Sequence, residues 1–276
     1  MKKIIEFNKI NFGYEKNLPI LKDVSFVINE GEYICVVGHN GCGKSTISKI
    51  LIGLLKPWSG TIKLFDQAID QSNYHLLREN IGVIFQNPEN QFVGLTVEDD
   101  IAFGLENKQI DPLKMESIIV GVAKTLKIDK LLKLGPQNLS GGEKQKVAIA
   151  SILAMEPKII VFDEATAMLD PKSKKEIKNL MLELKQKYHK TIISITHDMD
   201  EAVKADKILL MNSGQVQDFA SPFVVFQQVD KVKNAALDQP FALKLSTELN
   251  KINSHVNPTL NSMELIKNIV NLKKNN

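Results

Sequence analysis

Cysteine is scarce in this chain, and its scarcity argues against a fold held by disulfides or zinc. The 276 residues contain two cysteines, Cys35 and Cys42, which lack metal-ligand spacing. Long hydrophobic runs are also missing. The longest nearly apolar stretch, Val147–Met155, is far shorter than the ~18 residues that a membrane-spanning helix needs. We therefore expect neither a disulfide nor a membrane span.

A strong excess of one charge sign is absent as well. The chain has 35 basic and 32 acidic residues, a net charge of +3, so the charge balance does not predict nucleic-acid binding. The start of the sequence, MKKIIEFNKI, reaches Glu6 after only a few apolar residues, unlike a secretory signal peptide. With 43% hydrophobic and 24% charged residues, the composition is that of an ordinary soluble protein. Because neither a signal peptide nor a membrane span is expected, we expect the protein to stay in the cytosol.

Apolar runs that alternate with helical patterns predict an α/β fold. Runs of four or five apolar residues are typical of strands buried on both faces, and strand–helix alternation favours a mainly parallel sheet with crossover helices. The expected strands are Ile4–Ile10, Val24–Ile28, Tyr33–Val37, Thr61–Phe65, Ile81–Phe85, Ile159–Phe162, Thr191–Thr196 and Lys207–Met211. The expected crossover helices are Ser45–Leu55, Pro171–Lys187 and Met199–Lys204.

The stretch between Asn87 and Pro157 has no strand-like run. Its helical patterns cover Thr96–Glu106, Pro112–Lys127 and Ser140–Glu156. We interpret residues 87–157 as a helical subdomain inserted into the α/β core.

Beyond Lys231 the chain changes character, which predicts a main domain of residues 1–230 and a C-terminal helical extension of residues 231–276. A helix near the end has one apolar side, formed by Leu265, Ile266, Ile269, Val270 and Leu272. That side either packs on the protein's own surface or contacts a second chain.

The segment GHNGCGKS, Gly38–Ser45, follows the expected strand Tyr33–Val37 and begins a helix. We call it the phosphate loop, because its glycines turn successive backbone N–H groups toward an anion and the helix adds its positive end. We expect Lys44 to bridge the terminal phosphates and the Ser45 hydroxyl to coordinate Mg²⁺. Cys42 contributes either only its backbone N–H or a reactive thiol as well, and we expect the site to be sensitive to thiol reagents.

A second motif, KIIVFDE, supplies two adjacent acids. Its apolar run predicts a buried strand that brings the Asp163 carboxylate near the magnesium ion. Glu164 lies one residue further and would face a water beside the γ-phosphate, which favours hydrolysis over transfer to a second substrate. His197 follows the strand-like TIISIT at the same edge and would reach the γ-phosphate. A solvated acid and a structural histidine are the alternatives.

The segment NLSGGEKQKVAIA begins a further helix. Ser140 and Glu143 have the spacing of a capping box, so Ser140 should cap the helix and Glu143 should brace it. Gly141 and Gly142 leave backbone N–H groups uncovered at the positive helix end.

With LSGGE at Leu139–Glu143, which we call the signature segment, the chain resembles the ATP-binding subunits of ABC transporters. The further matches are Tyr14 (the aromatic that stacks on adenine), Gln86 (Q-loop), Ala167–Asp170 (D-loop) and His197 (switch histidine), all in family order between Ile4 and Asp230. The resemblance implies a P-loop NTPase (RecA-like) core, an antiparallel β subdomain, the inserted helical subdomain and a C-terminal helical extension.

The resemblance also implies ATP and Mg²⁺, and two chains that dimerise head to tail so that each signature segment closes the other chain's site. The residues implied to hold ATP are Tyr14, Gly38, His39, Asn40, Gly41, Cys42, Gly43, Lys44, Ser45 and Thr46, with Ser140, Gly141 and Gly142 of the opposite chain. Those implied for the metal are Ser45, Gln86 and Asp163, and those for catalysis are Glu164, His197 and Gln86. Glu143 replaces the usual glutamine and brings negative charge near a triphosphate.

The stretch IFQNPENQFVGLTVEDDIAFGLEN, Ile84–Asn107, is similar to the energy-coupling factor ATPases of the cobalt and vitamin type, and most similar to the first of their two paired subunits. This implies an ATPase that energises an importer for vitamins or transition-metal ions from the cytoplasmic face of the membrane, as a peripheral protein. The implied partners are a second ATPase subunit, a transmembrane T-component beside Gln86–Asp100 and a substrate-binding S-component, with no nucleic acid. Phe92 either meets such a partner or is buried in the helical subdomain.

Two other functions compete with this interpretation. One is the ATPase of a different ABC importer, with another Q-loop neighbourhood. The other is a soluble ABC ATPase acting on nucleic acid or ribosomes, although the long inserted coiled coil or the second cassette typical of those proteins is absent from this sequence. A GTPase is disfavoured because no N-K-x-D motif occurs.

Overall fold

The computed structural model describes residues 2–252 and 256–274, with the side chains of residues 272–274 left out. The strands are β1 (Lys3–Phe12), β2 (Leu21–Asn29), β3 (Tyr33–Val37), β4 (Ser59–Leu64), β5 (Gln67–Ala68), β6 (Ile81–Ile84), β7 (Ile159–Asp163), β8 (Thr191–Ile195), β9 (Lys207–Asn212) and β10 (Gln215–Ala220). The helices are α1 (Lys44–Leu51), α2 (His75–Asn80), α3 (Val97–Asn107), α4 (Pro112–Leu126), α5 (Gly141–Ala154), α6 (Pro171–Tyr188), α7 (Met199–Ala202), α8 (Pro222–Gln227), α9 (Val229–Asn234), α10 (Phe241–Ile252) and α11 (Ser262–Lys274).

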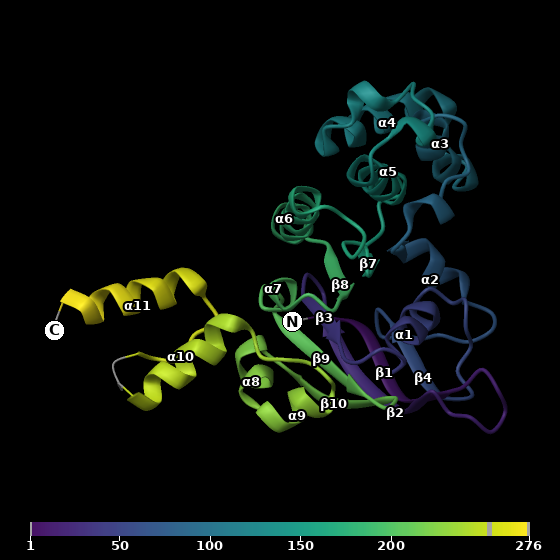
Figure 1. Cartoon of the computed structure of the whole chain (residues 1–276). Helices are drawn as coiled ribbons and strands as arrows, with labels where there is room; N and C mark the ends of the chain where they lie inside the picture. Colours follow the sequence, from purple (N-terminus) through teal and green to yellow (C-terminus); the bar gives the residue numbers. More distant parts are fainter. Residues whose placement is uncertain (1, 253–255, 275–276) are drawn as a thin grey trace.

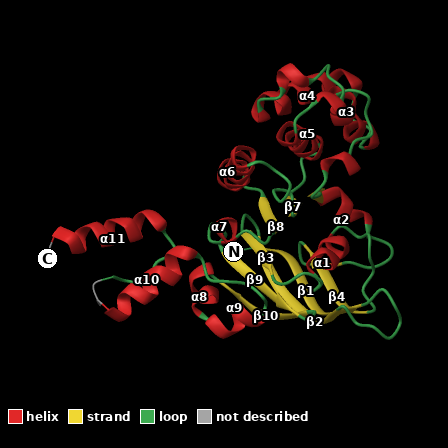
Figure 2. Ribbon diagram, viewed as in Figure 1, coloured by secondary structure: helices red, strands yellow, loops and turns green. Residues whose placement is uncertain are grey.

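Two sheets form the body of the molecule (Figure 2). The larger sheet has the strand order β10-β9-β3-β8-β7-β6, with parallel pairing from β9 to β6 and one antiparallel edge strand, β10. The smaller sheet is antiparallel, with the order β2-β1-β4-β5. The structure thus confirms the parallel core and the antiparallel β subdomain expected from the sequence.

The parallel strands are apolar throughout because both of their faces are covered. In β3, Ile34 and Val36 pack with the smaller sheet and α1, whereas Tyr33, Cys35 and Val37 pack with the helices on the opposite face. All five residues of β3, and all five of β7, are buried. This double coverage explains why the sequence shows continuous apolar runs rather than alternation.

Helices α3, α4 and α5 form a group of their own at one end of the molecule (Figure 1). No strand occurs in this part of the described chain, between the end of β6 and the start of β7, as the sequence predicts. α5 is the central helix of the group: Val147, Ala150 and Ala154 are buried in the same cluster as residues of α3 and α4. The limits of the subdomain at residues 87 and 157 stay a prediction.

Several elements depart from the sequence-based expectation. The helix expected over Ser45–Leu55 ends at Leu51, because the chain turns through Ile52 and the positive φ of Gly53. β5, α2, β10 and α8 were not expected, whereas α10 lies within the expected C-terminal helical extension. β10 is only half-buried, with polar residues along it, so it lacks the apolar run that marks the inner strands.

The C-terminal helices α10 and α11 project from the body of the molecule (Figure 1). They pack on each other through Ala242, Val256 and Leu265, with Leu249 and Ile269 partly buried alongside. Ile266 and Val270 remain exposed. Leu265 and Ile269 thus fit the alternative of packing within the chain, Ile266 and Val270 do not, and the side chain of Leu272 lies outside the described residues.

Candidate functional site

The phosphate loop connects the buried strand β3 to α1. Gly38, Gly41 and Gly43 all have positive φ values, of 154°, 80° and 107°. A side chain on Gly38 would collide with the backbone of Met211, whereas one on Gly41 would meet nothing. The loop therefore leaves open space at Gly41, where backbone N–H groups can approach an anion.

Lys44 opens α1 and is buried. Its ammonium group donates to the carbonyl oxygens of Gly38 and His39 at 2.8 and 3.0 Å. Ser45 is exposed in the first turn of α1, next to buried Thr46. The lysine side chain thus lies across the loop that the sequence assigns to phosphate.

His39 and Asn40 form the outer part of the loop. The Nδ1 atom of His39 lies 2.7 Å from the carbonyl oxygen of Asn40, and its Nε2 atom lies 3.2 Å from Oδ1 of Asn212 at the end of β9. The loop is therefore anchored to a neighbouring strand of the sheet as well as to its own helix.

The thiol of Cys42 is fully buried, and burial raises its pKa. A neutral, inaccessible thiol reacts slowly, because the thiolate is the nucleophile. The expectation that thiol reagents would attack this site is therefore wrong, because the Cys42 thiol is not accessible in this structure. The loop uses the backbone at Cys42 and packs its side chain inward.

Tyr14 lies next to the start of α1. Its hydroxyl is 3.5 Å from that of Thr46, and its ring meets Phe12 edge-on at 5.2 Å. The side chain is 57% exposed, so a large part of the aromatic surface is open to solvent beside the phosphate loop, which suits stacking with a nucleobase.

Asp163 ends β7 and faces α1. Burial raises the pKa of its carboxyl group, while the side chains of Ser48, Lys49 and Lys44 act in the opposite direction. A buried carboxylate near the lysine of the phosphate loop is well placed to share a cation. The donor set of the Ser45 hydroxyl, the Gln86 amide oxygen and the Asp163 carboxylate consists of the oxygen ligands that Mg²⁺ prefers.

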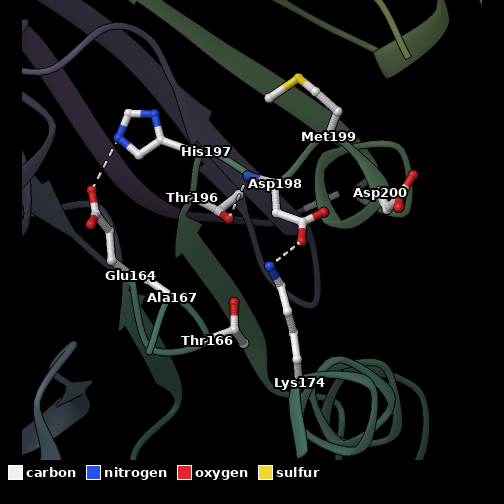
Figure 3. Close-up of a pocket in the computed structure, with 9 residues that line it drawn as sticks. All are labelled: Glu164, Thr166, Ala167, Lys174, Thr196, His197, Asp198, Met199 and Asp200. Carbon is white, nitrogen blue, oxygen red and sulfur yellow. Dashed lines mark hydrogen bonds and ion pairs between the residues drawn. The ribbon is translucent and has the colours of Figure 1, made fainter. Parts of the chain in front are cut away.

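Glu164 follows Asp163 in a left-handed backbone conformation, with φ at 52°. Its backbone N–H donates to the carbonyl of Ile195 in β8 at 2.9 Å, so the turn continues the pairing of β7 with β8. Its carboxylate Oε1 lies 3.2 Å from Nε2 of His197 (Figure 3). The structure thus brings together the acid and the histidine that the sequence assigns to catalysis.

A cavity of about 450 Å³ opens beside this pair (Figure 3). Its lining comes from the turn after β7, the start of α6 and the segment after β8: Glu164, Thr166, Ala167, Lys174, Thr196, His197, Asp198, Met199 and Asp200. The cavity is lined by side chains of both charge signs, with the Glu164–His197 pair at its edge, so a charged ligand could be bound there.

Gln86 is exposed two residues after the end of β6. The backbone before it is held by Gln91, whose Oε1 accepts from the N–H of Phe85 at 2.9 Å and whose Nε2 donates to the carbonyl of Val83 at 3.0 Å. The amide of Gln145, in α5, donates to the Phe85 carbonyl at 3.3 Å. These roles of Gln91 and Gln145 were not predicted, since no sequence pattern indicates which backbone groups a glutamine side chain will bind.

The end of this loop is fixed by Asp100, which is buried in α3. Its Oδ1 accepts from the N–H of Val93 at 2.9 Å, and its Oδ2 accepts from the hydroxyl of Ser151 in α5 at 2.8 Å. Phe92 is partly buried against the core of the helical group.

The signature segment caps α5 as the sequence predicts. The Ser140 hydroxyl accepts from the N–H of Glu143 at 3.4 Å, and the Glu143 carboxylate accepts from the N–H and the hydroxyl of Ser140 at 2.8 and 2.7 Å. These bonds from Ser140 lower the pKa of Glu143. Ser140 and Gly141 are exposed, whereas Gly142 is buried where a side chain would collide with Ser173 of α6.

The D-loop residues Ala167–Asp170 lead into α6. Asp170 caps that helix, and its Oδ1 accepts from the N–H groups of Lys172 and Ser173 at 3.0 Å each. Because Ser173 also touches Gly142, the D-loop and the signature segment meet at the start of α6. The signature helix α5 nevertheless lies apart from α1 (Figure 1).

No described helix has the length and apolarity of a membrane span. Within the described residues, no cluster of three or more His, Cys, Asp and Glu side chains could hold a metal ion on its own. A magnesium site would therefore need the mixed donors named above together with phosphate oxygens.

Comparison with known proteins identifies relatives over nearly the whole length. The ABC transporter family profile matches residues 21–167. The energy-coupling factor transporter ATP-binding protein EcfA1 of Ureaplasma parvum is 55% identical over 265 residues, which cover 96% of this chain and 90% of that protein. The protein of the same name from Mycoplasma pneumoniae is 53% identical over 268 residues, covering 97% and 96%.

Solved structures agree with these relatives. The cbiO1 protein of Clostridium perfringens, part of the ABC transporter complex cbiONQ, has a TM-score of 0.78 at 32% identity and covers 92% of this chain and 97% of that one. An ATP-binding cassette in a dimeric post-hydrolysis state bound to ADP and Pi has a TM-score of 0.71 at 27% identity, covering 79% and 98%. The chain therefore belongs to the ABC transporter family as an ATP-hydrolysing ATP-binding protein of the energy-coupling factor type.

Proposed function

We propose that this chain hydrolyses ATP to drive an energy-coupling factor importer for vitamins or transition-metal ions. It works as one half of a head-to-tail pair of cassettes, with a related ATPase subunit as the other half. The pair sits on a transmembrane T-component at the cytoplasmic face of the membrane, and a separate S-component captures the cargo. The structure of the cbiO1 relative, described as part of a multi-subunit transporter complex, supports this assembly.

The proposal rests mainly on the exposed N-terminal end of α5. Ser140 and Gly141 are exposed at the positive end of a 14-residue helix. That end belongs to the helical group, apart from the phosphate loop of the same chain (Figure 1). A second chain placed head to tail would supply the anion, and Ser140, Gly141 and Gly142 would then close the partner's nucleotide site.

We assign a role to each site residue. Tyr14 stacks on the adenine, the phosphate loop with Lys44 binds the phosphates, and Thr46 supports Tyr14. Glu164 orients and deprotonates the attacking water, while His197 steadies the γ-phosphate. Their 3.2 Å pairing holds both side chains toward one edge of the cavity.

Ser45, Gln86 and Asp163 would hold Mg²⁺, which, when bound, neutralises charge on the phosphates. Gln86 also stands where β6 passes into the helical group. Through Gln91 and Gln145 the backbone at this point contacts both the sheet and α5. A change at the nucleotide is thereby passed to the helical group.

The surface for the T-component lies beside Gln86–Asp100. Val93, Leu95 and Phe103 are 63%, 87% and 44% exposed. Val93 and Phe103 line a groove of about 210 Å³ between α3 and α5, and Leu95 follows Val93 by two residues in the same segment. The full lining is Gln91, Val93, Asp100, Phe103, Gly104, Asn107, Ala148, Ser151, Ile152 and Met155. An apolar groove at the end of the Q-loop suits a helix from a membrane subunit.

The C-terminal extension would add to the contact between the two ATPase subunits. Its exposed apolar residues include Phe241 at 75%, Ile266 at 53% and Val270 at 44%. These side chains lie on helices that project from the body, where a second subunit can reach them (Figure 1).

The test is co-purification of the tagged chain, expressed in its own cells, with membrane subunits identified by mass spectrometry. We expect a second ATPase and a small hydrophobic membrane protein with wild-type chain, and their loss with Leu95→Glu. The matched control is Leu113→Glu, because Leu113 is 91% exposed on α4, away from the groove. Co-purification with ribosomes or DNA in place of membrane subunits would overturn the proposal.

A further inference from the structure

The carboxylate of Glu201 is fully buried, with 1% of the residue exposed, although it belongs to the short helix α7 directly after His197. Its Oε1 accepts from the hydroxyl of Ser194 in β8, and its Oε2 accepts from the hydroxyl of Thr166 at 3.2 Å. Burying a carboxyl group is costly unless it is hydrogen-bonded, so both hydroxyl groups are needed to keep this side chain inside.

The two hydroxyl groups come from different parts of the site. Thr166 belongs to the turn that follows Glu164, in which the N–H of Ala167 donates to the Glu164 carbonyl at 3.0 Å. Glu164 itself has a φ of 52°, a conformation that side-chain-bearing residues adopt only when their surroundings hold them. The bond from Thr166 to Glu201 is a contact that holds this turn.

His197 is attached to the same helix from the other side. The Asp198 N–H donates to the Thr196 hydroxyl at 3.0 Å, and Asp198 Oδ1 accepts from the N–H of Glu201 at 3.0 Å. α7 is thus tied to the histidine segment through its backbone and to the glutamate turn through the side chain of Glu201.

We propose that Glu201 is a positioning residue that holds the turn carrying Glu164 against the segment carrying His197, and so sets the 3.2 Å contact between those two side chains. The inference rests on the proposed function, in which Glu164 activates the attacking water.

The experiment compares ATP hydrolysis by the purified complex with wild-type chain, Glu201→Ala and Glu201→Gln. We expect Glu201→Ala to lower kcat by about tenfold or more, since a small misplacement of a catalytic group is costly, with KM for ATP changed by less than about twofold. Glu201→Gln should recover most of the rate, because an amide can accept from one hydroxyl and donate to the other.

A second pair of variants distinguishes a loss of positioning from a loss of folding. Thr166→Val removes only the hydroxyl that reaches Glu201, while Thr191→Val removes a buried hydroxyl that accepts from the N–H of Gly31 at 2.9 Å, at the opposite end of β8. We expect kcat to fall with Thr166→Val and to stay at the wild-type value with Thr191→Val, at similar thermal stability.

These experiments distinguish a failure of the inference about Glu201 from a failure of the proposed role of Glu164. If Glu164→Gln is inactive while Thr166→Val and Glu201→Ala keep the wild-type kcat, the inference about Glu201 is wrong and the proposed function stands. If Glu164→Gln hydrolyses ATP normally, the assignment of Glu164 is wrong. A failure of Glu201→Gln to recover the rate also contradicts the positioning role.

Discussion

The carboxylate of Asp198 joins α7 to α6. It caps α7 and pairs with Lys174 and Lys178 of α6 at 2.7 Å each. Burial by itself would raise its pKa, but the two lysines outweigh that effect and hold the pKa at about 2, below the ordinary 3.8. Because the folded value lies below the unfolded one, the ionised carboxylate stabilises the fold above pH 3.8, and this contribution is lost as the pH falls toward 2.

We therefore expect Asp198→Asn to lower the free energy of unfolding by about 2 kcal/mol at neutral pH. The difference from wild type should shrink as the pH falls below about 4. Urea denaturation followed by circular dichroism at several pH values measures it. A difference that stayed constant down to acidic pH would show that the ion pairs are not its source.

Glu143 is a second residue whose charge has a measurable consequence. It accepts both the N–H and the hydroxyl of Ser140, so the hydroxyl is engaged with a carboxylate rather than free for a phosphate. Glu143→Gln keeps an acceptor for the N–H and removes the negative charge. We expect the KM for ATP of the assembled complex to fall about fivefold, equivalent to about 1 kcal/mol.

Salt provides the control for this prediction. The effect of Glu143→Gln should weaken at high ionic strength, since it arises from a charge that is partly exposed to solvent. Glu116→Gln makes the same charge change at an exposed position of α4 and should leave KM unchanged. Equal KM values for wild type and Glu143→Gln in low salt would contradict the role of the charge.

At the scale of elements, the Q-loop is held by side chains rather than by a regular ladder. Instead of a neighbouring strand, the side-chain amide of Gln91 forms hydrogen bonds with the backbone of Phe85 and Val83. Gln91→Met keeps the length of the side chain and loses both bonds, of about 1 kcal/mol each. We expect amide exchange at Phe85 to accelerate by about thirtyfold.

Hydrogen–deuterium exchange by mass spectrometry measures this acceleration over the peptide that contains β6. Gln67→Met, at an exposed position of β5, is the matched control and should leave exchange at β6 unchanged. If Gln91→Met also left amide exchange at β6 unchanged, the hydrogen bonds from Gln91 would not be what protects the end of this strand.

The sequence predicted the inner elements well because burial on both faces leaves continuous apolar runs, as in β3 and β7. It also predicted the capping box of α5, since that depends on two residues at fixed spacing. It missed β10 and α2, whose residues are mostly half-exposed or exposed and carry no strong pattern. Glu201 was missed for another reason: its importance arises from contacts with Ser194 and Thr166, which only the fold brings together.

At the scale of the whole molecule, sheet topology places the site. β3, β7 and β8 are neighbouring parallel strands, so the phosphate loop, Glu164 and His197 follow their carboxyl ends at one edge. The phosphate loop and the Glu164–His197 pair were predictable from sequence because each follows an apolar run. The signature segment lies on a separate helical group, so a complete site of the proposed kind needs a second chain.

The most direct measurement of this account is ATP hydrolysis and ATP-dependent assembly of Glu164→Gln, with Lys44→Ala as a control that cannot hold the phosphates. With its partner ATPase and Mg²⁺, we expect Glu164→Gln to hydrolyse ATP at least about a hundredfold more slowly than wild type. It should also form a stable two-cassette complex, seen by light scattering, only when ATP is present. Wild-type hydrolysis by Glu164→Gln, or no ATP-dependent assembly by it, would contradict the account.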